Sequence, residues 1–366
     1  MSSDSDSIGY TKKMKYKNTM LAKIERNQIP LSRSLLFALY LSHFINPRGI
    51  SSKFLCLQYK VGTNASGEAM YEIGIDDVYY VIRWVVLLTF LRSSLMRWCF
   101  EPFVSYFCSV KDQKTKTRFA EQSWSFVYFT CSFIVGFYLY FHSPYWLNID
   151  HLYSDWPHYQ LTSLFKRYYL VSIAFWLQSV FVLNIEARRK DHYQMFSHHI
   201  ITCILIIGSY YYYYIRIGHL ILMIMDSVDI SLSAAKMLKY MSFHVICDFM
   251  FFIFMCSYVF LRIGLYNYLL YHAWSKASEL MRDAKCVSGL PQKRCWTPSV
   301  INAFLGLLGG LQVITIIWMY LIIKVASRVF SGVGAEDVRS DSEDASDTEE
   351  VSKEMKSPGV KVSEKN

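Results

Sequence analysis

The chain has 366 residues, of which 53% are hydrophobic and 17% aromatic, and its mean hydropathy is +0.20. These values fit a membrane protein better than a soluble one. The net charge of +9 resides in particular loops, and no zinc-finger spacing or RNA-binding pattern accompanies it, so nucleic acid is not an expected partner.

Eight apolar runs follow along the chain, each approaching the ~20 residues that a transmembrane helix requires. They cover residues 31–46, 78–100, 121–146, 165–186, 192–214, 216–240, 245–267 and 298–326. The second run contains Arg83 and Arg92, so we expect this helix to be tilted, to snorkel or to be lined by protein. The sequence therefore predicts an all-α integral membrane protein with about eight transmembrane helices, in which residues 31–330 form the membrane domain.

The loops between these runs predict the orientation, because cytoplasmic loops are rich in Lys and Arg. Basic residues concentrate in segment 1–30 and in the loops 100–120 and 186–191, which fall on one side when eight helices alternate. We therefore expect both termini to be cytosolic. Loop 271–297 disagrees, because it is basic and would be lumenal.

Several residues outside the apolar runs are candidates for covalent modification. The Asn64 sequon falls in the first lumenal loop and is a glycosylation candidate. Ser340 and Ser346 lie in the acidic tail 331–366 and each precede an acid by three residues, the pattern of acid-directed kinases; the alternative is a merely disordered, solvated tail. Cys286 and Cys295 flank one loop and can form a disulfide if that loop is lumenal, and no cysteine pair has CxxC spacing.

Ionisable residues recur inside the fifth and sixth apolar runs, where they are costly and indicate function. His198 and His199 lie roughly 10 Å from the cytosolic end of the fifth run, and Asp229 lies about 16 Å from that of the sixth. Asp226 is three residues from Asp229 and shares its helix face, which Lys236 continues. Because a short turn joins the two helices, we expect the imidazoles and carboxylates to meet.

This cluster favours acid–base or nucleophilic chemistry. An imidazole beside a carboxylate can remove a proton from an amine or accept an acyl group. Adjacent histidines on a helix point about 100° apart, which is poor for chelation, so no metal is expected. The preceding Arg188, Arg189 and Lys190 can hold an anionic group such as the head of coenzyme A, although they equally suit plain topology signals.

The segments "RRKDHYQMFSHHIIT" and "MDSVDISLSAAKMLKY" resemble the Lag motif of ceramide synthases in the TLC-domain family. The resemblance is strongest over residues 165–245, with a TLC-like region at about 117–330 and the Lag motif at about 188–240. The residues that carry it are Trp176, Lys190, Asp191, His198, His199, Thr202, Asp226, Asp229, Leu232, Ala235 and Lys236.

The resemblance implies a helical bundle or barrel that encloses an acyl-chain tunnel. It also implies N-acylation of a sphingoid base by a long-chain or very-long-chain acyl-CoA, with the acyl-CoA as co-substrate and no cofactor. His198, His199, Asp226 and Asp229 would then be catalytic, with Asp191, Trp176 and Lys236 supporting them.

A fungal-type member would lie in the endoplasmic-reticulum membrane, with a small single-span regulatory subunit and a homodimer or heterodimer as further associations. The alternatives are a non-catalytic TLC-type lipid sensor or translocon helper, which would not need the His–Asp set, and another membrane acyltransferase.

Overall fold

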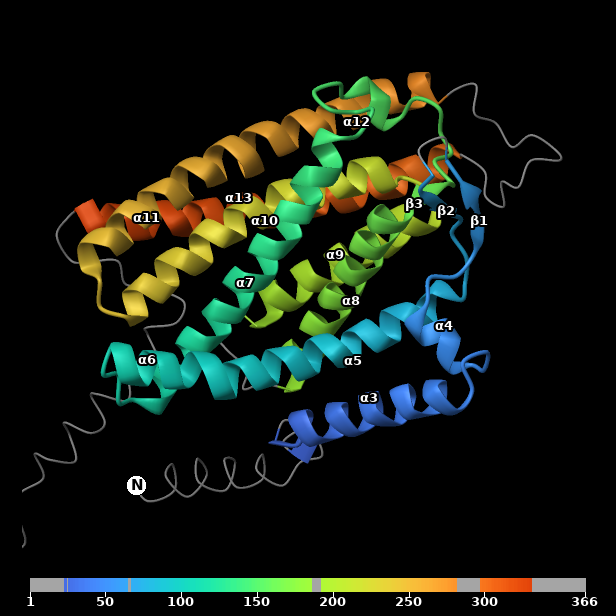
Figure 1. The fold of residues 1–366 in the computed structure, drawn as a ribbon. Helices are drawn as coiled ribbons and strands as arrows, with labels where there is room; N and C mark the ends of the chain where they lie inside the picture. Colours follow the sequence, from blue (N-terminus) through green and yellow to red (C-terminus); the bar gives the residue numbers. More distant parts are fainter. Residues whose placement is uncertain (1–22, 25, 65–66, 186–191, 282–296, 331–366) are drawn as a thin grey trace, which may run out of the picture.

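The computed structural model describes residues 23–330, apart from residues 25, 65–66, 186–191 and 282–296. Long helices running the length of the molecule make up most of this part of the chain (Figure 1). They confirm the prediction of a mainly α-helical membrane protein. Six of these helices are long and apolar enough to cross a membrane: Asp77–Phe107, Gln113–Phe141, Ser163–Ile185, Ile215–Tyr240, His244–Leu280 and Pro298–Ser327.

Several of these spans contain more than one helical element. The first joins α5 (Asp77–Leu95), a π-helical turn η1 (Met96–Phe100) and α6 (Glu101–Phe107). The fifth joins α11 (His244–Ser257), the π-helical η3 (Tyr258–Leu265) and α12 (Tyr266–Leu280). The others are α7 (Gln113–Phe141), α8 (Ser163–Ile185), α10 (Ile215–Tyr240) and α13 (Pro298–Phe330).

Two more helices match expected spans but are not among these six candidates. They are α3 (Gln28–Ile45) and α9 (His192–Tyr211), the helix with the double histidine. Both lie alongside the other helices, and successive long helices alternate in direction from α3 to α13 (Figure 1). The count of eight membrane crossings stays a prediction.

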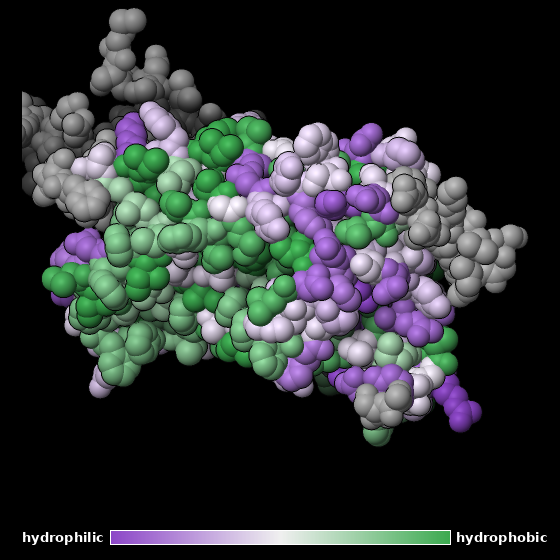
Figure 2. Space-filling model, turned by 90° about the horizontal axis from the view of Figure 1, so that it is seen from above, coloured by the Kyte–Doolittle hydropathy of each residue, from purple (hydrophilic) through white to green (hydrophobic). Residues whose placement is uncertain are grey.

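Hydrophobic side chains cover much of the outer surface of the bundle. Figure 2 shows them over the part of one face that lies away from the sheet, whereas hydrophilic residues gather toward the sheet end. On α11 and η3 the exposed fractions reach 83% for Val245, 64% for Phe249 and 74% for Phe260. Because a soluble protein rarely exposes so large a contiguous apolar patch, this surface faces lipid.

A small three-stranded antiparallel sheet lies at one end of the bundle (Figure 1). It contains β1 (Lys60–Thr63), β2 (Ala69–Tyr71) and β3 (Leu161–Thr162), with Lys60 opposite Tyr71 and Met70 opposite Thr162. The short helix α4 (Ser51–Leu55) and the 3₁₀ turn η2 (Asp150–Leu152) lie in the same connections. The sequence analysis did not predict this sheet, because strands of two to four residues carry no readable alternation.

A buried ion pair fastens the sheet to the helices. Lys166 Nζ on α8 lies 2.7 Å from Asp77 Oδ1 on α5, and both side chains are almost fully buried. Lys166 also donates to the carbonyl of Glu72 beside β2, and Tyr210 donates to Asp77 Oδ2 at 2.8 Å. Four segments are thereby held together at one point.

The helix α10 occupies the centre of the fold and packs against α7, α9 and α11. Gly218 near its start allows a close approach, because a Cβ at this position would collide with the hydroxyl group of Tyr169 on α8. This packing places the middle of α10 beside the two histidines of α9.

Candidate active site

His198 and His199 lie on α9 among aromatic rings. The Trp176 ring of α8 stands edge-on to both imidazoles, with centroids 5.6 Å from His198 and 5.4 Å from His199. The Trp318 ring of α13 lies 5.0 Å from that of His198. Nδ1 of each histidine is buried and has no hydrogen-bond partner within the described part of the chain.

His219 on α10 differs from this pair of histidines in its hydrogen bonds. It is fully buried, its Nε2 donates to the carbonyl of Gly136 at 3.0 Å, and its Nδ1 accepts from the hydroxyl of Tyr145 at 2.7 Å. Both ring nitrogens of His219 are therefore hydrogen-bonded within the protein, whereas Nδ1 of His198 and Nδ1 of His199 are not.

Two cavities meet beside His198. The first comprises about 940 Å³ of space and is almost entirely apolar, the second comprises about 1760 Å³ and has many polar walls, and both are partly open. Both are lined by the same four residues, Trp176, His198, Asp229 and Arg262. His199 lines only the second cavity. A substrate that extends from one cavity into the other must pass these side chains.

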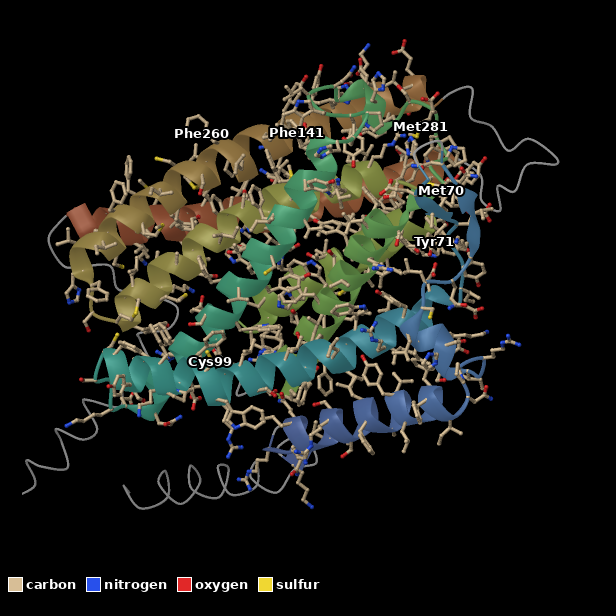
Figure 3. All side chains as sticks on the ribbon, viewed as in Figure 1. Met70, Tyr71, Cys99, Phe141, Phe260 and Met281 are labelled. Atoms are coloured by element: carbon tan, nitrogen blue, oxygen red, sulfur yellow. The ribbon has the colours of Figure 1, made fainter. Side chains whose placement is uncertain are left out.

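The apolar cavity extends from this junction toward the sheet end of the bundle. Its walls come from α8, α9, α10, α12 and α13, and Ile206, Leu222 and Leu308 are typical members. At the far end it is bounded by Met281, which follows α12, and by Tyr153 and Tyr214. Figure 3 places Met281 at the same end of the bundle as Met70 and Tyr71 of the sheet.

The polar cavity extends from the junction the other way, toward the end of α10. Lys236 and Tyr240 from that helix, Arg92 from α5 and Gln178 from α8 line it. His192, the first residue of α9, also contributes. Cationic and hydrogen-bonding groups, together with the carboxylate of Glu121, therefore line this side of the site, where the expected cytosolic loops begin.

Asp229 is joined to Arg262, a residue that the sequence analysis missed. The guanidinium Nη2 lies 2.7 Å from Asp229 Oδ1 and also donates to the carbonyl of Met225 at 3.1 Å. Arg262 is the only basic residue of the apolar run 245–267, and this was itself a signal, because an ionisable group at membrane depth is a functional candidate. It lies within η3, and π-helical turns occur frequently at functional sites.

Asp226 takes a different position from Asp229 although both lie on α10. It is only 3% exposed and lines neither cavity. Its electrostatic neighbours include Tyr128 of α7 and Tyr168 of α8, and Ser132 is its hydrogen-bond partner. Within the described residues no hydrogen bond joins either carboxylate to His198 or His199, so the predicted catalytic roles of the aspartates stay predictions.

Other candidate residues lie in different places or outside the described part of the chain. Asn64 follows β1 at the sheet end, where its Oδ1 accepts from the backbone N–H of Glu68. The described residues contain no cluster of three His, Cys, Asp or Glu side chains that could hold a metal ion. The candidates outside the described residues are Arg188, Arg189, Lys190, Asp191, Cys286, Cys295, Ser340 and Ser346.

Comparison with known proteins yields a consistent group of relatives. The family model described as the TLC domain matches residues 118–324. Sphingosine N-acyltransferase lag1 of Schizosaccharomyces pombe is 40% identical over 85% of this chain and 77% of its own length. Ceramide Synthase FUM18 of Gibberella moniliformis is 35% identical over 82% and 75%. Ceramide synthase LAG1 of Saccharomyces cerevisiae is 32% identical over 87% and 78%.

Proposed function

The chain belongs to the TLC-domain family as a fungal-type ceramide synthase, and we propose that His198 is the centre of its reaction. The enzyme transfers an acyl group from acyl-CoA to the amine of a sphingoid base, forming a ceramide and free CoA. The observation that supports the site is the junction of the two cavities, because His198 lines both of them. Asp229 and Arg262 line the same junction.

The chemical character of the two cavities assigns the parts of the substrates. The apolar cavity would hold the acyl chain, because hydrocarbon is stabilised by apolar walls. The polar cavity would hold the thioester arm of CoA, with Lys236 toward its anionic part. Arg188, Arg189 and Lys190 would extend this basic surface just before α9. The thioester carbonyl would then lie at the junction.

Nε2 of His198 is the ring nitrogen that can meet a substrate, because Nδ1 is buried. In one route Nε2 attacks the thioester carbonyl, the C–S bond breaks, CoA leaves as a thiolate that takes up a proton, and the amine then displaces the imidazole. In the other, Nε2 removes a proton from the ammonium, the free amine attacks the thioester carbonyl and the C–S bond breaks. CoA then leaves as a thiolate that takes the proton back from the imidazolium, and the proton lost by the attacking nitrogen passes to water. Both routes end with a new amide C–N bond and regenerated imidazole.

Arg262 would stabilise the negative charge that develops on the carbonyl oxygen in either route. Its guanidinium reaches the junction and is held there by Asp229. Asp229 is thus a positioning residue for the guanidinium, and Asp226 supports the wall formed by α7 and α8. Trp176 and Trp318 would fix the plane of the imidazole. The proposal invokes no metal or further cofactor.

Finer features of the proposal concern location and partners. The membrane would be that of the endoplasmic reticulum, with both termini in the cytosol and the sheet end in the lumen. The long helices alternate in direction, so the start of α3 and the end of α13 lie at the same end of the bundle. This arrangement supports the placement of both termini on one side of the membrane. A small single-span subunit and a dimer remain part of the proposal on the strength of the family resemblance.

The decisive experiment supplies purified enzyme with labelled acyl-CoA and dihydrosphingosine and measures labelled ceramide. We expect His198→Ala to lower the rate at least a thousandfold, because it removes the nucleophile or base, and His199→Ala to lower it strongly. His142→Ala changes an exposed histidine at the end of α7 and serves as the matched control. Near-normal ceramide formation by both variants would contradict the site assignment, and acylation of a hydroxyl group alone would favour another acyltransferase.

A further inference from the structure

Gln178 on α8 presents a hydrogen-bonding group to the polar cavity that the protein itself does not use. Only 1% of the residue is exposed, and it lines the cavity two residues beyond Trp176. Neither polar atom of its amide has a hydrogen-bond partner among the described residues, and of the two only Nε2 is fully enclosed. A half-turn about the last side-chain bond exchanges the two atoms, so the amide can offer the cavity either an acceptor or a donor.

Ser233 on α10 is a second residue of this kind. It is 3% exposed and lines the polar cavity one helical turn beyond Asp229. A serine within a helix can return its hydroxyl to the carbonyl four residues earlier. Ser179 of the same cavity does so, since its Oγ donates to the carbonyl of Phe175 at 2.8 Å. Ser233 Oγ makes no hydrogen bond within the described part of the chain, and protein does not enclose it.

Both groups lie close to the reacting centre on its polar side. The two helices run from the sheet end toward the opposite end of the bundle (Figure 1). Gln178 lies about 3 Å further along α8 than Trp176, whose ring contacts the imidazole of His198. Ser233 lies about 6 Å further along α10 than Asp229. The groups can therefore meet atoms that are attached within a few bonds of the reacting carbonyl.

The polar cavity also has an apolar wall, which restricts the kind of molecule that fits it. Phe254 of α11 and Trp318 and Ile322 of α13 line this wall and belong to one hydrophobic cluster. A molecule with a polar head and a hydrocarbon tail can contact both kinds of wall, whereas the arm of CoA is polar along its length. A sphingoid base has this amphipathic character, and the two carbons next to its amine-bearing carbon each carry a hydroxyl group.

We propose that Gln178 and Ser233 bind the hydroxyl groups beside the amine of the sphingoid base, so that the enzyme selects bases with these hydroxyls over amines without them. This inference rests on the proposed function and deepens it by naming residues that recognise the second substrate. A hydroxyl group both donates and accepts, which matches an amide and a serine hydroxyl. In the acyl-imidazole route CoA leaves before the amine attacks, which frees both residues for the base.

The physical basis of the selection is the cost of leaving buried polar groups unpaired. An amine that lacks the hydroxyls would cover Gln178 and Ser233 without satisfying their hydrogen bonds, and this penalty falls on the analogue alone. Dihydrosphingosine would replace the water that these groups otherwise bind. The preference should therefore appear in kcat/KM for the amine and should be independent of the acyl-CoA that is supplied.

The test compares dihydrosphingosine with amines of equal chain length that lack one or both hydroxyls, with a single acyl-CoA. The measured quantity is kcat/KM for dihydrosphingosine divided by that for each analogue, and in the unaltered enzyme we expect at least tenfold for the amine without either hydroxyl. Gln178→Met and Ser233→Ala should each lower this ratio by about three- to tenfold, because each removes one hydrogen bond. Gln178→Asn retains the amide and should keep part of the preference.

Ser179→Ala is the matched control, because Ser179 lines the same cavity but its hydroxyl is bonded within its own helix. It should leave the ratio unchanged. Both amines meet the same enzyme sample, so any loss of folded protein in a variant cancels from the ratio.

Equal use of all the amines by the unaltered enzyme, or a ratio that survives in both Gln178→Met and Ser233→Ala, would overturn the inference. A raised KM for acyl-CoA with an unchanged ratio would also overturn it, since the two residues would then bind the arm of CoA. These outcomes are distinct from failure of the proposed function, in which the unaltered enzyme would form no ceramide from dihydrosphingosine.

Discussion

Two buried ion pairs of equal length serve different ends of this molecule. Lys166 Nζ and Asp77 Oδ1 are 2.7 Å apart at the sheet end, with side chains 0% and 4% exposed. Arg262 Nη2 and Asp229 Oδ1 are also 2.7 Å apart, but their side chains are 7% and 20% exposed. The difference in exposure arises because the second pair borders two cavities.

The surroundings of the two pairs differ more than their geometry. The first receives additional hydrogen bonds from the Tyr210 hydroxyl and the Gly74 backbone, and Lys166 donates to two carbonyl groups. The second retains unused bonding capacity, since Arg262 Nε has no hydrogen-bond partner within the described residues. Because a saturated charge pair can only hold structure together, the first pair should affect stability, whereas the second should affect catalysis.

The largest expected effect follows from breaking the saturated pair. Lys166→Met leaves Asp77 as a buried charge without its cation, and this should lower the free energy of unfolding by about 3–5 kcal/mol. Thermal unfolding in detergent measures the change. Lys53→Met is the control, because Lys53 pairs with Asp76 at 3.1 Å on the surface, where the loss should be small. Equal losses in both variants would contradict a special role for the buried pair.

His158 should make the sheet end sensitive to acid. It lies in the loop between α7 and β3, and burial, together with the nearby Arg216, lowers its pKa from 6.5 to about 4, although Asp155 acts in the opposite sense. Below about pH 6.5 His158 binds a proton in the unfolded chain, whereas in the folded protein it stays neutral until the pH falls to about 4. Folding stability should therefore decrease as pH falls through this window, by up to roughly 3 kcal/mol.

The measurement is the thermal midpoint at a series of pH values between 4 and 7. His158→Gln keeps a donor for the carbonyl of Ser154 but does not titrate, so its midpoint should vary less across the window. His142→Gln alters an exposed histidine and should keep the slope of the unaltered protein. An unchanged slope in His158→Gln would assign the acid sensitivity to other groups.

The two ion pairs also show which features of the site can be predicted from the sequence and which cannot. The expectation that His198 and Asp229 lie at similar depth came from helix rise alone, and the structure shows that both residues line the junction of the two cavities. The sequence did not predict that Asp229 would line the cavities while Asp226 would not. Residues three apart on a helix differ by about 60° in direction, which suffices for one to face a cavity and the other a neighbouring helix.

The two cations were harder to assign than the histidines. Arg262 and Lys166 come from segments far from their partners, and a single sequence carries no information on which distant helices touch. The sheet was missed for a related reason, since its strands are held by Lys166 and by backbone pairing rather than by a hydrophobic pattern. Local periodicity thus predicts helices well and tertiary polar contacts poorly.

Altering the second ion pair tests the catalytic side of the comparison. Arg262→Gln should lower kcat by about a hundredfold, or roughly 2.7 kcal/mol, because it removes a charged donor from the junction. The thermal midpoint should change much less than in Lys166→Met, since Asp229 borders the polar cavity and can be hydrated. Arg262→Lys retains the charge and should recover part of the activity. A large loss of stability with unaltered kcat would place Arg262 with the structural pair.

The smallest expected effect belongs to an exposed carboxylate at the start of a helix. Asp112 caps α7, where its Oδ2 accepts hydrogen bonds from the backbone N–H and hydroxyl of Thr115 at 2.8 and 2.7 Å. Asp112→Ala should therefore lower the free energy of unfolding by about 1 kcal/mol, and Asp112→Asn by less. The same hydrogen bonds lower the pKa of Asp112 below its ordinary value of 3.8. The contribution of Asp112 to folding stability is therefore fully present above pH 3.8 and is lost as the pH falls further. Thermal midpoints of the Ala variant and the unaltered enzyme should thus converge in acid, and a difference that persisted there would show that the cap does not depend on the charge.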